Sequence, residues 1–148
     1  MTKVQAIRNF ASVVASEHVT IARERDDWSI SMADSKPRLI LPHDLNQNDP
    51  EDKMFRADFV KRCPMARGFA SVTLSILHEL GHHFNREVVI FADKLVGDDM
   101  EEHLTLPHEV IATEWAINWL KDPINRKTAK AFEKEYFSGC SLSISNSN

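Results

Sequence analysis

The segment SILHELGHHF, residues 75–84, places three histidines and a glutamate close together in an otherwise apolar stretch. His78 and His82 are four residues apart, and Glu79 follows the first of them, which is the pattern His-Glu-x-x-His. Side chains at positions i and i+4 project from one face of an α-helix. Two imidazoles placed in this way are suited to zinc, whose Zn–N distances are about 2.0–2.1 Å. The sequence therefore predicts a metal site here, with Zn²⁺ as the preferred ion.

The two neighbours of this histidine pair have different predicted roles. Glu79 lies about 100° round the helix from His78, within reach of a water beside the metal. A carboxylate there can take a proton from that water and pass it to a leaving amine, so Glu79 is the predicted general base. His83 is turned toward the apolar side of the helix, and we expect it to pack, partly buried, with a polar partner.

A catalytic zinc needs a third protein ligand and one open position. The metzincin continuation is ruled out, because Asn85 and Val88 stand where glycine and histidine are required. The next source is the predicted helix over residues 107–121, on which Glu109 shares a face with small and apolar residues. A carboxylate that points inward is costly unless it is paired or bound to a metal, so Glu109 is the predicted third ligand.

Alternatives to this choice remain. Glu109 could instead be a first-turn glutamate that complements the helix N-terminus. Other candidate ligands in and beside the acidic stretch before it are His103, His108, Glu101 and Glu102. Stabilisation of a tetrahedral oxyanion usually needs a further donor besides the metal, and four side chains are candidates for it: Tyr136, His43, His103 and His108.

At this point the sequence resembles a known family. His78-Glu79-Leu80-Gly81-His82, followed by Glu109-x-x-Ala112 and a Trp-Ala-x-x-Trp-Leu helix, resembles the ImmA/IrrE-type metallopeptidases, which are small gluzincin-like proteins common in bacteria and phages. The resemblance implies that His78, His82 and Glu109 bind zinc and that Glu79 is the general base. Thr113 departs from the pattern, because the family usually has Asn or Asp there, so the partner of a ligand histidine is missing or differently supplied.

The same resemblance bears on partners. Members of such families often occur beside a helix-turn-helix regulator, and some cleave a repressor. It therefore implies a zinc endopeptidase acting on a protein or peptide substrate, with a transcriptional regulator as a candidate. Two other functions stay open: a metal-stabilised interaction protein with weak or no catalysis, such as a toxin, anti-repressor or regulatory partner, and a metal-free helical binding domain.

Composition agrees with one soluble domain. The chain has 148 residues, a net charge of −4 and a pI of about 6.0, so it lacks the basic footprint that nucleic-acid binding needs. Cys63 and Cys140 are far apart and fit a reduced, cytoplasmic setting. The N-terminus does not have the form of a signal peptide, and no apolar run approaches the roughly 18 residues of a membrane span. We expect neither direct nucleic-acid binding nor a membrane segment.

Periodicity and turn signals predict an α+β, zincin-like single domain over residues 1–137 and a polar, disordered tail over 138–148. The predicted sheet is small and about three-stranded, with an N-terminal helix before it and C-terminal helices after the motif helix. In chain order the predicted elements are a helix over 3–24, a hairpin over 28–33 and 38–41, a loop over 43–53, a weak strand over 54–63, the motif helix over 66–85, a short helix or turn over 87–95, and helices over 107–121 and from Pro123 to Phe137.

Overall fold

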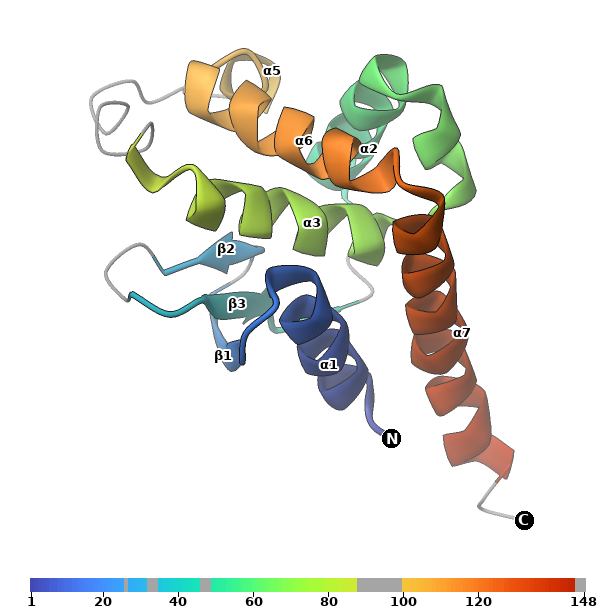
Figure 1. Cartoon of the computed structure of the whole chain (residues 1–148). Coiled ribbons are helices and arrows are strands. Elements are labelled where there is room, and N and C mark those ends of the chain that lie inside the picture. The colour runs from blue at the N-terminus through green and yellow to red at the C-terminus, as the bar shows by residue number, and fades with distance from the viewer. Residues whose placement is uncertain (26, 32–34, 46–48, 88–99, 146–148) are drawn as a thin grey trace.

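The computed structural model describes residues 1–25, 27–31, 35–45, 49–87 and 100–145, and the statements below concern these residues. They form an α+β fold, as predicted, with a small sheet and a set of surrounding helices (Figure 1). The helices are α1 (Lys3–Ala15), α2 (Pro50–Arg62), the 3₁₀ helix η1 (Pro64–Gly68), α3 (Ser71–Phe84), α5 (Met100–His103), α6 (Pro107–Leu120) and α7 (Pro123–Ser145). Most of the predicted element over 87–95 lies outside the described residues.

The sheet has three strands in the order β1-β3-β2. They are β1 (Thr20–Arg25), β2 (Ser29–Ile30) and β3 (Arg38–Pro42). β2 and β3 are antiparallel, which confirms the predicted hairpin, although β3 includes Pro42. β1 pairs with β3 in parallel, with Ile21 beside Leu39.

The first helix is shorter than predicted, and strand β1, which was not predicted, occupies the end of the range expected to be helical. α1 ends at Ala15 because Ser16 adopts the left-handed conformation with φ 56° and closes the helix. The Ser12 hydroxyl then accepts the Val19 N–H at 3.0 Å, which directs the chain into β1. Ile21 matches the helical spacing of the sequence but belongs to this strand, where a β-branched side chain fits well.

The predicted strand over 54–63 is wrong, because those residues belong to helix α2. Asp49 is the N-cap, and its carboxylate accepts the Asp52 N–H at 2.8 Å. Pro50 occupies the first turn, where its missing N–H costs nothing. These start signals lie inside the segment that the sequence analysis assigned to a loop.

α3 lies across the middle of the molecule, between the sheet and α1 on one side and α6 on the other (Figure 1). Its N-cap, Ala70, has no side chain that could cap the helix. The Glu133 carboxylate of α7 takes this place, accepting the Ala70 N–H at 2.7 Å and the Thr73 hydroxyl at 2.6 Å. A carboxylate at a helix N-terminus also complements the helix dipole. The C-terminal helix thus holds the start of the motif helix.

α7 also closes the core against α1. The Phe10 ring stacks on Phe132 with ring centroids 4.5 Å apart and meets Trp119 edge-on at 5.8 Å. One continuous apolar cluster joins α1, the sheet, α3, α6 and α7. The α7 backbone remains helical to Ser145, beyond the predicted end at Phe137, and residues 146–148 of the predicted disordered tail lie outside the described residues.

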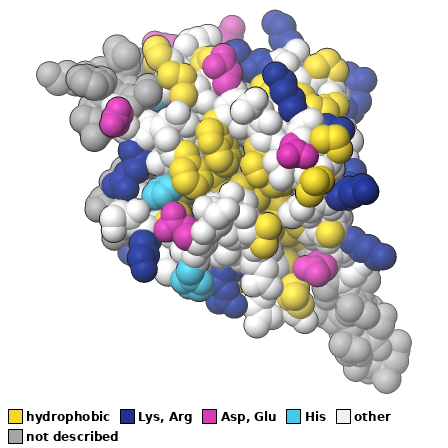
Figure 2. Space-filling view, viewed as in Figure 1, with side chains coloured by type: hydrophobic (Ala, Val, Ile, Leu, Met, Phe, Trp, Pro, Cys, Tyr) yellow, Lys and Arg dark blue, Asp and Glu magenta, His cyan; other side chains and the backbone are white. Residues whose placement is uncertain are grey.

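The surface seen in Figure 2 has its Lys and Arg side chains spread along the edges rather than gathered in one patch. None of the described helices combines the length and apolarity needed to cross a bilayer.

Candidate metal centre

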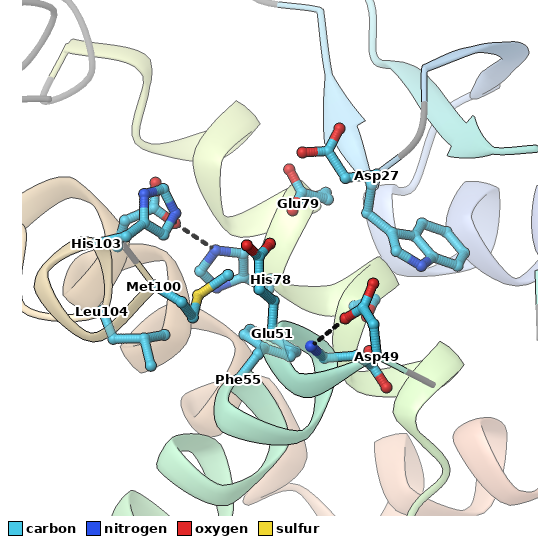
Figure 3. A pocket seen from close by; sticks show the side chains of 13 residues that line it. Asp27, Asp49, Glu51, Phe55, His78, Glu79, Met100, His103 and Leu104 are labelled. Atoms are coloured by element: carbon cyan, nitrogen blue, oxygen red, sulfur yellow. Dashed lines mark hydrogen bonds and ion pairs between the residues drawn. The ribbon is translucent and has the colours of Figure 1, made fainter. Parts of the chain in front are cut away.

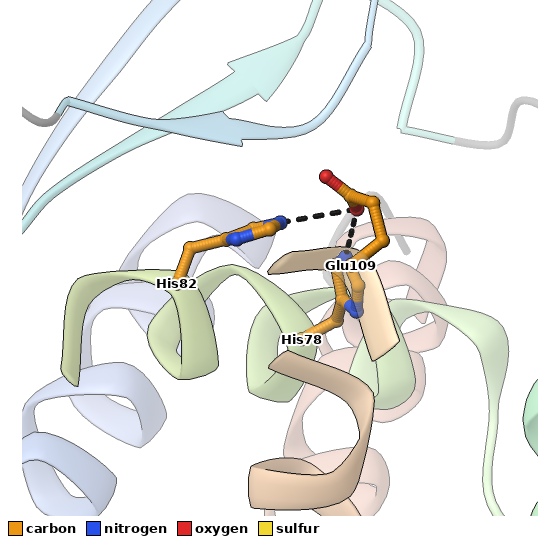
Figure 4. A group of neighbouring side chains, drawn as sticks. All are labelled: His78, His82 and Glu109. Atoms are coloured by element: carbon orange, nitrogen blue, oxygen red, sulfur yellow. Dashed lines mark hydrogen bonds and ion pairs between the residues drawn. The ribbon is translucent and has the colours of Figure 1, made fainter. Parts of the chain in front are cut away.

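Three of the predicted site residues meet at one point. His78 and His82 project from α3, and Glu109 projects from the first turn of α6 (Figure 4). The Nε2 atoms of His78 and His82 lie 2.8 and 3.1 Å from the same atom, Oε1 of Glu109. One potential ligand atom from each of the three residues lies within 4.8 Å of the other two. The convergence of two α3 imidazoles and an α6 carboxylate is therefore confirmed.

A close approach of two helices makes this meeting possible. A Cβ atom added to Gly81 would lie 2.4 Å from the Ala112 carbonyl oxygen, so the α3 and α6 backbones are in contact there. Ala112 and Ala116 are both fully buried on the facing side of α6. Small residues on both helices thus bring Glu109 within reach of the histidines on α3.

Glu109 was predicted to share a face of α6 with small and apolar residues, and this is confirmed, since it is buried together with Thr113, Ala116 and Leu120. The orientation of α3 is confirmed only in part. Most of its predicted apolar face is buried, but Phe84 is 42% exposed and stacks on Trp115. His78 and His82 are themselves buried, because α6 covers the face on which they stand.

Thr113 supplies the partner that the resemblance left in question. Its Oγ1 atom lies 2.9 Å from Nδ1 of His78, and the side chain is buried. A partner at one ring nitrogen fixes the orientation of an imidazole and directs its other nitrogen. Here the contact holds the His78 ring with Nε2 toward Glu109.

The charge of the buried Glu109 carboxylate is compensated by imidazoles. Although burial opposes ionisation, hydrogen bonds from His103, His78 and His82 hold the pKa of the Glu109 carboxyl far below its usual range. Burial lowers the pKa of His78. For His82 burial acts in the same direction, but the hydrogen bond to Glu109 and the charge of Glu79 outweigh it and raise the pKa. Buried charges need such pairing or a metal.

Glu79 stands beside the three residues rather than among them. It lines a cavity of about 630 Å³ together with His78 and Glu109 (Figure 3). Burial raises the pKa of Glu79 to about 8, with a further contribution from the charge of Glu109 and an opposing one from His82. A carboxyl group whose pKa is near neutrality can both take up and release a proton at physiological pH.

His103 and His108 also reach the centre. His103 Nε2 lies 3.1 Å from Oε1 of Glu109, and His108 Nε2 lies 3.0 Å from Oε2. The carboxylate of Glu109 is therefore in contact with four imidazoles. The sequence analysis named both histidines only as candidates. Their position shortly before Glu109, a predicted ligand, already indicated that they could lie near the metal centre.

Other candidates lie elsewhere. Tyr136 is buried in the core, where its ring packs against Phe132, and His43 is exposed just beyond β3. Glu101 and Glu102 are exposed on α5, and neither belongs to the ligand cluster.

His83 was expected to be partly buried, and in the structure it is buried. It lies outside the ligand cluster. Within the part of the chain that the structure describes, its Nδ1 atom has no hydrogen-bond partner, so the predicted polar partner is not found.

The wall of the cavity carries residues that the sequence analysis did not single out. Asp27, Asp49, Glu51 and Asp52 line it beside the aromatic side chains of Trp28 and Phe55, and among the described residues no Lys or Arg belongs to the lining. Burial, together with the charge of Asp49, raises the pKa of Asp52. The cavity beside the centre is therefore strongly acidic.

Two imidazoles and a carboxylate are a donor set that binds zinc and other divalent transition metals. Thr113 is not a ligand, but its hydroxyl contacts His78 and orients that imidazole. The residues present thus fit a metal ion. Comparison with models of protein families, with curated proteins and with solved structures finds no match to this chain.

Proposed function

We propose that this chain is a zinc-dependent endopeptidase that hydrolyses peptide bonds of a protein partner. The observation that carries the proposal is the meeting of His78, His82 and Glu109 beside a cavity whose wall includes Glu79. Three ligands and an adjacent carboxylate are the composition of a hydrolytic zinc centre. The motif is the same one that gives the sequence its resemblance to the ImmA/IrrE-type metallopeptidases, and a zincin-like fold is part of the proposal.

In this proposal each group has a separate task. His78, His82 and Glu109 hold the ion, and Thr113 orients the first of these ligands. Zinc bound there would act as a Lewis acid and lower the pKa of water toward about 7. The Glu79 carboxylate takes the proton from the attacking water and returns it to the nitrogen of the leaving amine.

The substrate in this proposal is a protein segment that enters the cavity. The volume of this cavity, about 630 Å³, is in the range of pockets that bind small ligands. A transcriptional regulator is the candidate partner that the family resemblance suggests.

The test separates metal binding from chemistry. The full chain, purified without a metal-affinity tag, is expected to contain about one zinc per chain by elemental analysis, and Glu109→Ala is expected to lose it. Glu79→Gln is expected to keep the metal and lose cleavage of a denatured protein substrate, because it keeps the side-chain shape but cannot carry the proton. Full metal content in Glu109→Ala would refute the ligand assignment.

A second function, a metal-stabilised interaction protein, is favoured by one observation: the three potential ligands are all buried in the contact between α3 and α6, where a bound ion would also hold the two helices together. The two functions differ in what Glu79→Gln does, because a protein without catalysis shows no cleavage that this variant could abolish.

A further inference from the structure

The cavity beside the metal centre is lined by two groups of carboxylates. Glu79 and Glu109 belong to the centre, and they line the cavity of about 630 Å³ together with His78. Four further carboxylates come from the loop before β2 and from the start of α2, and we call them the acidic wall: Asp27, Asp49, Glu51 and Asp52 (Figure 3). A substrate bond that lies at the centre therefore has the acidic wall next to it.

The acidic wall has no compensating cation. In the described part of the chain none of its four carboxylates forms an ion pair. Arg56, the cation that acts on Asp52, is held instead by the Ser71 hydroxyl at 3.4 Å and the Arg67 carbonyl at 3.2 Å. Burial and the charge of Asp49 raise the pKa of Asp52. A positive charge in the cavity would relieve this repulsion between like charges.

The spacing of the acidic wall does not suit a second metal ion. Among the described residues only His78, His82 and Glu109 bring three ligand atoms within 4.8 Å of one another. No three carboxylates of the wall can therefore share one ion. Carboxylates spread around a cavity suit a larger, organic cation, which is the ammonium group of Lys or the planar guanidinium of Arg.

Apolar groups in the same cavity can hold the stem of a basic side chain. Trp28 and Phe55 line it together with Met100 and Leu104. The Phe55 ring meets the His78 imidazole edge-on with centroids 5.1 Å apart, so it lies directly beside the centre. Lys and Arg place their methylene groups against apolar surface and their charge over aromatic faces. The cavity thus matches both parts of such a side chain.

A buried hydroxyl group at the cavity also lacks a partner. Ser75 of α3 is 5% exposed and lines the cavity. Among the described residues no hydrogen bond involves its hydroxyl. Buried polar groups are normally hydrogen-bonded, and a hydroxyl can accept from an ammonium or guanidinium group, which only donates. Ser75 therefore indicates, independently of the acidic wall, that a polar group enters the cavity.

We propose that the acidic wall forms a specificity pocket, which receives a Lys or Arg side chain of the substrate protein beside the bond that is cleaved. The inference rests on the proposed function, because the metal centre determines which bond lies next to the pocket. The carboxylates attract the basic group and repel an acidic one, so they select between substrates in both directions. The substrate class is a protein segment that contains a basic residue.

The first experiment measures binding of side chains that are too small to be cleaved as protein substrates. The zinc-loaded full chain is titrated, by NMR of its backbone and indole N–H groups, with the acetyl-methylamides of Arg, Lys, citrulline, norleucine and Glu. Citrulline has nearly the shape of Arg without its charge. Asp27→Asn and Asp52→Asn each remove one charge from the acidic wall. Asp58→Asn is the matched control, because Asp58 also lies on α2 but pairs with Arg62 and does not line the cavity.

We expect the Arg and Lys compounds to bind at least about tenfold more tightly than the citrulline and norleucine compounds. The Glu compound is expected not to bind. Asp27→Asn and Asp52→Asn are each expected to weaken binding of the Arg compound about two- to five-fold, the range for a partly exposed ion pair. Added salt is expected to weaken it further. Asp58→Asn is expected to match the wild type.

The second experiment locates cleavage sites. Denatured casein is incubated with the zinc-loaded wild type, and the new termini are identified by mass spectrometry. Lys and Arg are expected to be enriched at one fixed position relative to the cleaved bond. The double variant Asp27→Asn/Asp52→Asn is expected to lose this enrichment, whereas Asp58→Asn is expected to keep it.

The outcomes separate this proposal from the proposed function. Equal binding of the Arg, citrulline and norleucine compounds would overturn the pocket, and so would an equal loss of binding in Asp58→Asn. Cleavage of casein without a preference for basic residues would overturn the pocket and leave the peptidase in place. Selective binding of the cationic compounds by a protein that cleaves nothing would support the pocket and overturn the proposed function.

Discussion

Thr113 Oγ1 lies 2.9 Å from Nδ1 of His78 in the buried contact between α6 and α3. A threonine hydroxyl can both donate and accept a hydrogen bond. It can therefore satisfy Nδ1 when His78 donates from Nε2 to Glu109, and also when Nδ1 carries the proton and Nε2 is free for a metal. An Asp carboxylate would accept only, so threonine at this position suits both forms of the protein.

Replacing this hydroxyl is expected to weaken metal binding. Thr113→Val keeps the shape of the side chain but leaves Nδ1 of His78 without its partner, and loss of such partners costs about 10- to 100-fold in metal affinity. Thr113→Ser keeps the hydroxyl and is expected to bind within a few-fold of the wild type. Competition titrations with Zn²⁺ measure both, and equal affinities for valine and threonine would contradict the assignment.

Metal affinity is expected to fall in acid because of His82. In the metal-free protein burial lowers the pKa of this histidine, but the hydrogen bond to Glu109 and the charge of Glu79 reverse the effect and raise it above the ordinary 6.5. Nε2 must be unprotonated to bind a metal, so binding releases a proton at any pH below that raised pKa. In the metal-free protein, protonated His82 contributes to the free energy of unfolding. This contribution is lost as the pH rises through the raised pKa of His82.

Calorimetry can count this proton. Titrating Zn²⁺ in buffers of different ionisation enthalpy at about pH 6.5 is expected to show release of about one proton per ion, and affinity is expected to fall about tenfold per pH unit below the raised pKa. An affinity that is constant between about pH 6 and pH 8 would show that no ligand titrates in this range.

Gly81 is expected to tolerate no larger residue. In Gly81→Ala the new Cβ would meet the Ala112 backbone at 2.4 Å, and neither helix can yield without moving the other. We expect a loss of about 1–3 kcal/mol in the free energy of unfolding together with weaker metal binding. Chemical denaturation and zinc titration measure the two effects.

Gly68→Ala is the matched control for this substitution. The nearest atom to its Cβ would be Nζ of Lys130 at 4.0 Å, which is ordinary contact with a flexible side chain. Its stability is expected to stay within about 0.5 kcal/mol of the wild type. Equal behaviour of the two variants would show that the helix contact at Gly81 is not tight.

Glu133 is expected to stabilise the start of α3. Glu133→Ala removes the acceptor of the Ala70 N–H and the Thr73 hydroxyl, a change that typically costs about 0.5–2 kcal/mol at a helix N-terminus. Glu133→Gln keeps acceptor atoms and is expected to lose less. Glu135→Ala, at an exposed position on α7, should leave the denaturation midpoint unchanged; a similar loss there would point to a general effect of charge on α7.

The centre was predictable where helical periodicity carries information. His78, His82 and Glu109 lie on regular helices, so their directions follow from spacing, and a buried carboxylate among small residues is unusual enough to be noticed. His103 was not placed in this way, because α5 is a single turn and its direction depends on contacts with α2. Tyr136 was an equally good candidate in the sequence and lies in the core.

The fold was predictable in outline, with errors where two signals competed. Ile21 continued the apolar spacing of α1, and only the left-handed Ser16 ends that helix. In α2 the polar residues looked like a loop, although Asp49 and Pro50 form a regular helix start. By helix phase Phe84 lies on the apolar side of α3, yet it is exposed, because helix phase alone does not show which part of a helix its neighbours cover.

The carboxylate that anchors the motif helix is 63 residues away from Ala70 in the sequence and belongs to a helix that adds no ligand. A fragment trimmed to the histidine motif and Glu109 would keep every ligand but leave the first turn of α3 open to water. The smallest portion of the chain able to present these side chains in order therefore extends into α7. Shortening the chain from its C-terminal end should disturb the centre well before any of its own residues is removed.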